Sequence, residues 1–588
     1  MDGNGPAARR SLDLTRLQAA YADGSTTPAR VMADVLDRIV AAGDDAVWIS
    51  RVPDAALLAQ ARALPDPAAP LYGVPFAVKD NIDVAGLPTT AGCPAYAYTP
   101  TRHAPVVQRL VDAGAIPVGK TNLDQFATGL VGVRSPYGVP RNPFDAAMVP
   151  GGSSSGSAVA VAAGLVSFAL GTDTAGSGRV PAGFNNLVGL KPTRGWLSTT
   201  GVVPACRSLD CVSVFALTVP DALAVAEVAG GFDAADPYAR HPSPAPLVGF
   251  RFGVPTQAEF FGDREAEAAY EAAVRRAEGL GGTAVAFDYA PFAEAAALLY
   301  GPWAAERTAA AGQMLGQGDA LHPVTRAILE GGQSVTGAVL FQAQHRLAAL
   351  RRQVEPLWRD LDVLLLPTTG TAYSLAQLAA EPVRRNSDLG HYTNFTNLLD
   401  LAAIAVPSGS YASGFPIGIT LVGPAWTDRG LAGLAHRMHE AAGLALGATE
   451  HRAPTRPGWS PGNVGWTELA VFGAHLAGQP LNPALVALGG RLVRPCRTAP
   501  EYRMLALPGA VRRPALVRSA DGGALDGEVW ALPSHAVAAF LGSIAPPLGL
   551  GTVRLEDGPA LGFIAEADAA GEDITAHGGW RAWLASKA

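Results

Sequence analysis

The chain has 588 residues, of which 49% are hydrophobic and 16% charged, and this composition is typical of a globular protein with more than one domain. Its formal net charge of −7 leaves no cationic excess to attract a nucleic-acid backbone or an anionic membrane, so neither partner is predicted. The cysteines, at positions 93, 206, 211 and 496, are too few and too scattered for a disulfide framework, and no second Cys/His pair accompanies Cys206 and Cys211. We therefore expect neither a metal nor another cofactor.

Two stretches bear on where the protein works. Arg9-Arg10 is followed by charged residues where an export signal needs an apolar segment, which predicts a cytoplasmic protein. Residues 146–172 carry no charge but include several Gly and Ser, which favours a helix in a protein core over a membrane span.

The predicted elements begin with amphipathic helices, because Thr27-Pro28 supplies an N-cap and a first-turn proline ahead of apolar residues at helical spacing. Alternating apolar residues then predict strands at 74–78 and 115–118. After Pro150, a Gly/Ser-rich turn leads into an Ala/Val-rich helix, a strand over 165–170 and a second turn, Gly171–Ser177. This alternation of helices and short apolar strands predicts an α/β core.

The second half of this core is also a mixture of helices and strands. Residues 265–315 and 335–355 are rich in Ala and are predicted to be helical, whereas 363–367 and 418–422 are short apolar runs that predict buried strands.

A change in composition then predicts a domain boundary. Residues 448–464 are rich in Pro, Gly and Arg without apolar periodicity, which indicates a linker between domains 1–447 and 465–588. The second domain contains strand-like runs and is predicted to be a small mixed α/β or barrel-like unit. These runs are 469–472, 505–508 and 529–532.

Three features of the first domain need one explanation: Lys79 at the end of a predicted strand, the Gly/Ser-rich turn after Pro150, and Ser177 in the next turn. A serine hydroxyl is a poor nucleophile until a base removes its proton, and a lysine can act as that base when burial lowers its pKa toward neutrality. Taken singly, however, the turn could be a phosphate-binding loop or a plain connection, and Lys79 a surface cation. The turn lacks the Gly-Lys-Ser/Thr ending of a P-loop, which weighs against a nucleotide-binding module.

Together these features resemble a known family. Gly151-Gly-Ser-Ser-Ser-Gly-Ser-Ala and Gly171-Thr-Asp-Thr-Ala-Gly-Ser-Gly-Arg-Val-Pro-Ala are similar to the amidase signature. The resemblance implies a mixed β-sheet core flanked by helices and a Ser-cisSer-Lys triad, with Lys79 as base, Ser153 as the bridging serine after a cis peptide, and Ser177 as nucleophile. It also implies an oxyanion hole at Thr174, Ala175, Gly176 and Ser177.

The substrate is suggested by further segments. Tyr300-Gly-Pro-Trp-Ala-Ala-Glu-Arg307 and the stretch 121–132 resemble allophanate hydrolases. Allophanate is urea that carries a carboxylate, and the forked guanidinium of an arginine suits a planar carboxylate. The resemblance implies that Tyr300 and Arg307 hold that end and that the backbone at Gly129 contacts the amide.

The C-terminal segment 471–482 resembles the tail of allophanate hydrolases, whose fold is similar to γ-glutamyl cyclotransferases. The resemblance implies that this domain assists the loss of carbon dioxide from N-carboxycarbamate and makes His475 the matching residue, although a lone His is more often structural. No biotin-carrier motif of the Ala-Met-Lys-Met type is present, so we expect no urea carboxylase fused in this sequence. A pathway link to a separate biotin-dependent urea carboxylase and a link to triazine-type degradation both stay open. We also expect a homodimer. An amidase of other specificity and the glutaminase subunit of a tRNA-dependent amidotransferase remain alternatives.

Overall fold

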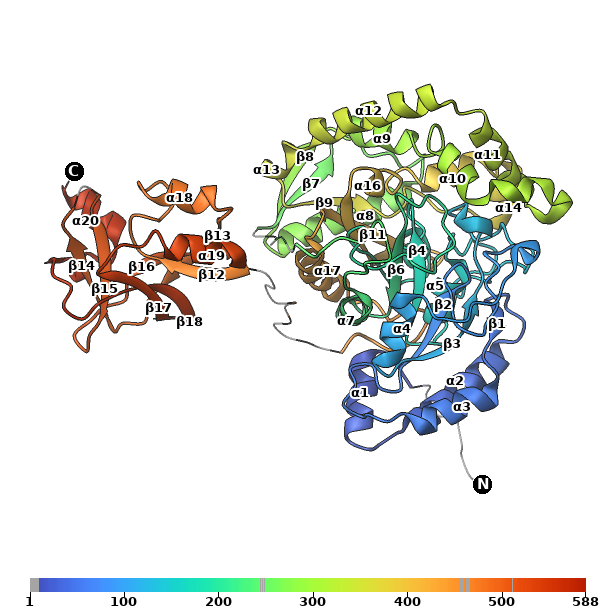
Figure 1. Cartoon of the computed structure of the whole chain (residues 1–588), viewed down its shortest axis with the longest axis horizontal. Coiled ribbons are helices and arrows are strands. Elements are labelled where there is room, and N and C mark those ends of the chain that lie inside the picture. The colour runs from blue at the N-terminus through green and yellow to red at the C-terminus, as the bar shows by residue number, and fades with distance from the viewer. Residues whose placement is uncertain are drawn as a thin grey trace. The chain divides into compact units, whose positions relative to one another are not determined.

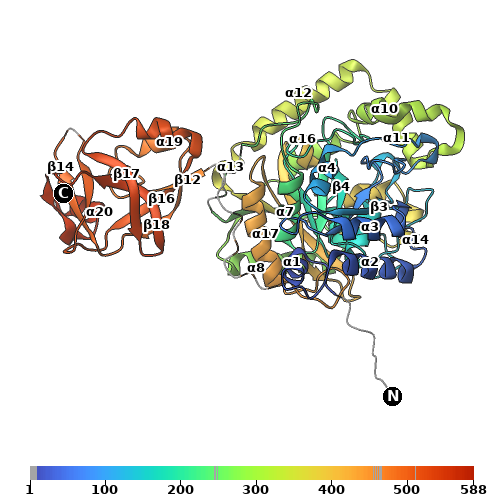
Figure 2. The same cartoon turned by 60° about the horizontal axis from the view of Figure 1, so that its bottom comes forward.

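The computed structural model describes residues 10–587 except 244, 246, 248, 455, 457, 458, 460, 462–465 and 510. It divides into two compact units, shown in Figure 1 and Figure 2, which are considered separately. The larger unit comprises the described residues of Met1–Pro242 and Phe250–Pro461, and the smaller one those of Ser243–Gly249 and Gly462–Ala588. The boundaries 1–447 and 465–588 stay a prediction, and part of the predicted linker 448–464 lies outside the described residues.

The larger unit is built on one mixed sheet, as the predicted α/β core requires, and this fold class is confirmed. The outermost pair β1–β3 is antiparallel. The pairs β3–β2, β2–β4, β9–β7 and β7–β8 are parallel, and the pairs between β4 and β9 are antiparallel. In spatial order the strands are β1 (Trp48–Arg51), β3 (Ile116–Thr121), β2 (Pro75–Lys79), β4 (Phe168–Asp173), β6 (Cys211–Ala216), β5 (Val188–Lys191), β10 (Leu401–Ser410), β11 (Pro416–Pro424), β9 (Val363–Pro367), β7 (Arg251–Pro255) and β8 (Thr283–Phe287).

Helices surround this sheet (Figure 1, Figure 2). The helix α5 (Ser155–Ala162) packs on β2, β3 and β4, α7 (Val219–Ala229) on β5 and β6, and α17 (Asp428–Ala442) on β10 and β11. Because both faces are covered, every residue of β2 and β4 is buried. Further α-helices of this unit are α1 (Leu14–Ala22), α2 (Pro28–Ala42), α3 (Asp54–Ala63), α4 (Pro105–Asp112), α6 (Val180–Phe184), α8 (Arg264–Gly279), α9 (Ala290–Ala297), α10 (Ala304–Ala311), α11 (Pro323–Gln333), α12 (Gly337–Val354), α13 (Leu357–Asp360), α14 (Leu375–Ala380), α15 (Arg384–Leu389) and α16 (Phe395–Leu398).

Local sequence signals explain some of these elements and not others. Thr27 caps α2 as predicted, with its side chain accepting a hydrogen bond from the N–H of Arg30. The prediction of continuous helix over 265–315 is wrong at β8, Thr283–Phe287, which pairs in parallel with β7. Gly281, at φ +85°, ends the preceding helical segment, and tertiary pairing then overrides the helix propensity of the alanines.

The carboxyl ends of β2 and β4 carry the predicted chemistry. The two strands are parallel neighbours with Val78 opposite Leu170, so Lys79, the last residue of β2, lies at the edge of the sheet where β4 ends. After Asp173 the chain turns toward α6, and this turn contains Ser177. The sheet thus places the lysine and the second serine at the same edge.

The smaller unit contains two sheets and a hydrophobic core that includes the buried side chains of Trp580 and Trp583. A five-stranded sheet has the order β13 (Arg491–Arg497), β16 (Asp526–Pro533), β12 (Trp466–Val471), β18 (Gly558–Ala565) and β17 (Leu548–Leu555). A three-stranded sheet has the order β15 (Arg513–Arg518), β14 (Tyr502–Leu507) and β19 (Glu572–Asp573). The helices α18 (Asn482–Ala487), α19 (Ser534–Leu541) and α20 (Trp580–Lys587) accompany them. The strands predicted at 469–472, 505–508 and 529–532 overlap β12, β14 and β16.

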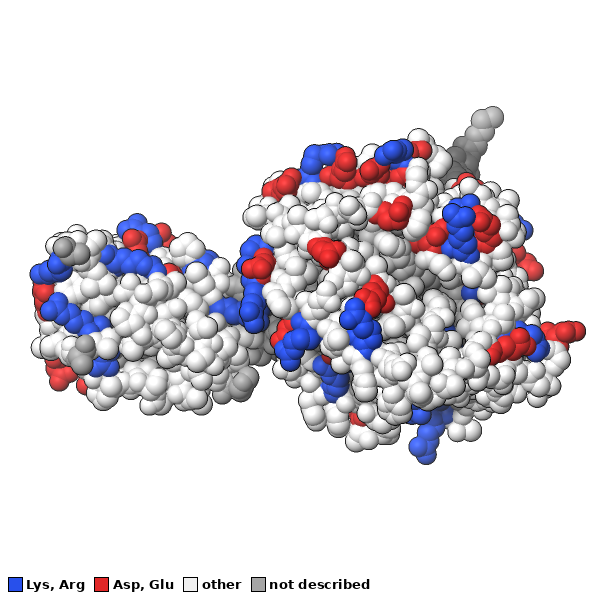
Figure 3. All heavy atoms as spheres, turned by 90° about the horizontal axis from the view of Figure 1, so that it is seen from above, with Lys and Arg blue, Asp and Glu red and all other residues white. Residues whose placement is uncertain are grey.

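The outer surface carries charges of both signs. Figure 3 shows acidic and basic side chains interspersed over the face in view, with broad uncharged areas between them. Within the described ranges, no helix is both long enough and apolar enough to cross a membrane.

Candidate active site

A buried lysine and two hydroxyl groups form the centre of the site. The Lys79 ammonium nitrogen lies 2.8 Å from Ser153 Oγ and 2.8 Å from Thr172 Oγ1. Lys79 and Ser153 are both 0% exposed. The peptide bond between Gly152 and Ser153 is cis. The end of β2 and a turn 74 residues further along the sequence therefore form a Lys–Ser hydrogen bond shielded from bulk water.

The surroundings of Lys79 favour its neutral form. Burial lowers its pKa to about 7, although the carboxylates of Asp124, Asp210 and Asp173 act in the opposite direction. A substantial fraction of the amine is then unprotonated near neutral pH, which a general base requires.

The turn between β4 and α6 is fixed by an ion pair. Arg179 binds Asp173 through two hydrogen bonds, of 2.9 and 3.0 Å, and both side chains are fully buried. Burial alone would raise the pKa of Asp173, but the charge and hydrogen bonds of Arg179 outweigh it, and the pKa lies below its ordinary value. The N–H groups of Gly176 and Gly178 donate to the same carboxylate, at 2.7 and 3.1 Å.

This geometry removes one of the predicted N–H donors of the oxyanion hole. The N–H of Gly176 is already directed to Asp173 and is not free to bind an oxyanion, so its predicted role is corrected. Among the residues that the structure describes, no acceptor bonds to the N–H groups of Ala175 and Ser177. Gly176 instead has a conformational role, because its φ is +130° and a Cβ at this position would lie 2.3 Å from Thr393 Oγ1.

Ser177 lies in this turn and is 2% exposed. It is five residues beyond Thr172, whose hydroxyl binds Lys79, and it lies between the two N–H donors to Asp173. Thr174, also predicted for the oxyanion hole, uses its hydroxyl to bind Asp210 at 2.5 Å. Burial raises the pKa of Asp210 to about 6, against the hydrogen bonds from Thr174, Cys206 and Ala205.

Arg307, Tyr300 and Gly129 converge although they come from different segments. The guanidinium of Arg307 lies over the Tyr300 ring, 5.3 Å from its centroid, and donates to Thr128 Oγ1 at 3.1 Å. Arg307 is 2% exposed, and its Nε has no hydrogen-bond partner in the described part of the chain. Gly129 follows Thr128 with φ +155°, and a Cβ there would lie 2.6 Å from Asp124 Oδ2. A buried donor without a partner is costly, which indicates that a ligand completes this site.

His475 occupies a different environment, in the smaller unit. Its ring stacks on Phe563 at 5.0 Å between centroids and meets the edge of Phe540 at 5.3 Å. Burial, followed by the charge of Arg513, lowers its pKa to about 4. The imidazole is therefore neutral near pH 7 and packs against the rings of Phe563 and Phe540.

Several residues of this arrangement were missed by the sequence analysis. Thr172 binds Lys79, Arg179 fixes the turn that contains Ser177, and Thr128 contacts Arg307. Thr172 and Arg179 lie inside the amidase signature, so the signal was present, but a sequence pattern does not show which side chain a hydroxyl or guanidinium contacts. No group of three or more metal-ligating side chains occurs among residues 10–587 as far as they are described.

Comparison with family models and known proteins agrees with this geometry. The family model described as Amidase matches residues 30–432, and the model described as Allophanate hydrolase C-terminal domain matches residues 467–585. The chain belongs to the amidase family and carries, in addition, the C-terminal domain of allophanate hydrolases.

Individual relatives refine this placement. The urea amidolyase of Saccharomyces cerevisiae is 41% identical over 95% of this chain, but the chain spans only 32% of that relative. A solved structure of Kluyveromyces lactis allophanate hydrolase is 39% identical, with a TM-score of 0.79, and the match covers 98% of this chain and 99% of that one. A glutamyl-tRNA(Gln) amidotransferase subunit of Oleidesulfovibrio alaskensis is 34% identical, over 73% of this chain and 97% of its own length.

Proposed function

We propose that the protein is an allophanate hydrolase, which converts allophanate and water to ammonia and N-carboxycarbamate. The observation that carries this proposal is the buried hydrogen bond between Lys79 Nζ and Ser153 Oγ, 2.8 Å long, at the sheet edge where the Ser177 turn begins. The likeness of the whole chain to the Kluyveromyces lactis allophanate hydrolase supports the choice of substrate.

In the proposed mechanism, neutral Lys79 accepts a proton from Ser153 while Ser153 takes the proton of Ser177. The Ser177 oxygen then attacks the terminal amide carbonyl of allophanate. Two proton transfers thus replace one, which lets a deeply buried lysine act on a serine that it does not touch. Proton return to the nitrogen releases ammonia and leaves an acyl group on Ser177, which water hydrolyses by the same relay in reverse.

The N–H groups of Ala175 and Ser177 stabilise the oxyanion in this proposal. They belong to a turn that the Asp173–Arg179 pair holds rigid, so their dipoles need no rearrangement during the reaction. The carboxylate of allophanate binds Arg307, whose Nε is free to donate, and Tyr300 packs against the guanidinium. Gly129 contacts the amide end through its backbone.

The proposal extends to the rest of the protein. N-carboxycarbamate must lose carbon dioxide, and His475 in the unit 465–588 is the residue proposed to assist this step, so that each allophanate yields two ammonia and two carbon dioxide. We also propose a homodimer in the cytoplasm, supplied by a separate biotin-dependent urea carboxylase. Light scattering of the purified chain tests the dimer.

The triad is tested with two serine variants. Ser177→Ala is expected to lower kcat for ammonia release from allophanate by roughly 10³-fold or more, because the nucleophile is lost. Ser157→Ala is the matched control, since Ser157 is equally buried but binds Thr121 Oγ1 and the carbonyl of Leu170. Ammonia release by Ser177→Ala at near wild-type rate would refute the mechanism.

Substrate choice is tested by comparing allophanate, biuret, malonamate and glutamine. The 34% identity to the Oleidesulfovibrio alaskensis protein makes a glutaminase the second candidate. Steady glutamine hydrolysis without allophanate hydrolysis would favour that candidate, whereas we expect the reverse.

A further inference from the structure

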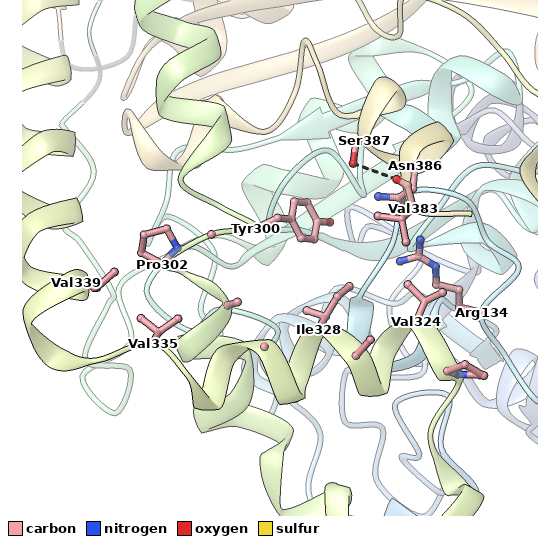
Figure 4. A pocket seen from close by; sticks show the side chains of 15 residues that line it. Arg134, Tyr300, Pro302, Val324, Ile328, Val335, Val339, Val383, Asn386 and Ser387 are labelled. Carbon is pink, nitrogen blue, oxygen red and sulfur yellow. Dashed lines mark hydrogen bonds between the residues drawn. The ribbon is translucent and has the colours of Figure 1, made fainter. Parts of the chain in front are cut away.

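A large apolar cavity lies beside the proposed substrate clamp. Its volume is about 750 Å³, and residues of α10, α11, the start of α12 and α15 line it (Figure 4). Tyr300 lines it, but neither Arg307 nor any residue of the proposed triad does. The apolar walls are formed largely by Pro302, Val324, Ile328, Val335, Val339 and Val383.

The cavity does not match the substrate in size or polarity. Allophanate is small and polar, whereas pockets of roughly 300–1,000 Å³ with apolar walls suit larger organic molecules. The cavity is also open to solvent through exposed apolar residues, since Val339 is 43% and Val383 61% exposed. Exposed aliphatic side chains at a pocket mouth are typical of a binding site.

One buried cation faces this apolar space. Arg134 is 1% exposed and lines the cavity, and Figure 4 shows its guanidinium directed toward the side of Val383 and Asn386. It donates to the main-chain carbonyls of Thr128 and Pro382, at 2.9 and 3.1 Å.

Arg134 forms no direct ion pair in the described part of the chain, although Asp124 Oδ2 and Arg134 Nη1 lie 2.6 and 3.2 Å from the same point, the position of a Cβ on Gly129. Within the described residues, no carboxylate lies in salt-bridge distance of its guanidinium. The nearby Asp124 accepts hydrogen bonds from the N–H groups of Val131, Gly132 and Arg134 itself. Because no described carboxylate forms a direct ion pair with it, the guanidinium of Arg134 is available to an anion that enters the cavity.

We propose that this cavity is a second ligand site, which binds a small monocarboxylate with an apolar body, such as an aryl-alkanoate. The carboxylate binds the guanidinium of Arg134, and the apolar body packs on Val324 and Ile328 of α11 and on the ring of Tyr300. This site goes beyond the proposed allophanate hydrolysis and lies on the other side of Thr128, which Arg134 contacts through the carbonyl and Arg307 through the hydroxyl.

The test is calorimetric titration of the full chain with 4-phenylbutyrate, and with 4-phenylbutanol as the uncharged analogue. The wild-type protein is expected to bind the carboxylate at least about tenfold more tightly than the alcohol. Ile328→Trp fills the cavity and is expected to weaken binding by about tenfold or more, whereas Val40→Trp, which adds the same ring at a 70% exposed position on α2, leaves binding unchanged.

Three results would overturn the proposal: no binding by wild-type protein, equal affinity for the acid and the alcohol, or undiminished binding by Ile328→Trp. Competitive inhibition of allophanate hydrolysis that persists in Ile328→Trp would place the ligand at Arg307 instead and would also overturn it. Because binding is measured without turnover, failure of the proposed function leaves this test intact. If Ile328→Trp does not fold, Ala327→Trp on the exposed side of α11 replaces it.

Discussion

Lys79 and His475 are both titratable residues whose pKa is lowered mainly by burial, yet their surroundings differ in kind. Lys79 is held by two hydroxyl groups at 2.8 Å, and the charges of three carboxylates partly offset the lowering of its pKa by burial. His475 is held by two phenyl rings, beside the charge of Arg513. A general base must be in hydrogen-bond reach of the group with which it exchanges a proton, and of these two side chains only Lys79 has a hydrogen-bond partner among the described residues. The comparison indicates that the surroundings of Lys79 are preorganised for proton transfer, whereas those of His475 consist of aromatic packing.

The largest effect is expected at Lys79 itself. Lys79→Met should lower kcat for ammonia release by roughly 10³-fold or more, because no other base contacts Ser153 Oγ in the described part of the chain. Steady-state ammonia assays measure it, and Lys587→Met, at an exposed lysine, is the control. Retained activity would show that Lys79 is not the base, and the contrast drawn between Lys79 and His475 would then fail.

The clamp is expected to show an intermediate effect. Arg307→Met should raise KM for allophanate by roughly 10- to 100-fold, because a charge-assisted hydrogen bond to the carboxylate is lost. The exposed Arg346→Met is the control. An unchanged KM would show that the carboxylate binds elsewhere.

The pH dependence of kcat/KM for ammonia release also tests the contrast between Lys79 and His475. Only neutral Lys79 is a base, so kcat/KM should rise roughly tenfold per pH unit below about pH 7 and level off above it. Measurement between pH 5.5 and 9 checks this, and His475→Phe should leave the profile unchanged. A rate of ammonia release that falls between pH 6 and 7 would indicate that the protonated lysine is the active form.

The smallest effect concerns stability. His475 has a folded-state pKa of about 4, below the ordinary value near 6.5, so the unfolded state binds the proton first and the stability of the smaller unit falls as pH drops from 6.5 toward 4. In His475→Phe, the decrease in the free energy of unfolding over this pH range should be smaller by roughly 1–2 kcal/mol. Hydrogen exchange of β12 at pH 7.5 and pH 5 measures it, and an identical pH dependence in both proteins would contradict the assignment.

The sequence predicted those features of the fold and the site that depend on residues adjacent in the chain. The amidase signature, the strand ending at Lys79 and the N-cap Thr27 all follow from adjacent residues. The strand Thr283–Phe287 was missed because its pairing with β7 is a tertiary effect. The contacts of Lys79 with Thr172 and of Arg307 with Thr128 were missed because they join distant segments.

The oxyanion hole shows that even the amidase signature does not predict which N–H groups are free to donate. The sequence motif includes Gly176 equally with its neighbours, but only the structure reveals that its N–H is directed to Asp173. Peptide-plane orientation depends on φ and ψ, which a residue pattern leaves open wherever glycine allows several conformations.

The distribution of lysines has a practical consequence for handling the protein. Of the four lysines, Lys79, Lys120 and Lys191 are 0% exposed, whereas the side chain of Lys587 is 53% exposed. Amine-reactive reagents require an accessible, unprotonated amine, so among the lysine side chains they will modify Lys587 and spare the other three. A dye, a biotin tag or a surface linker can therefore be attached at α20 while Lys79 stays unmodified.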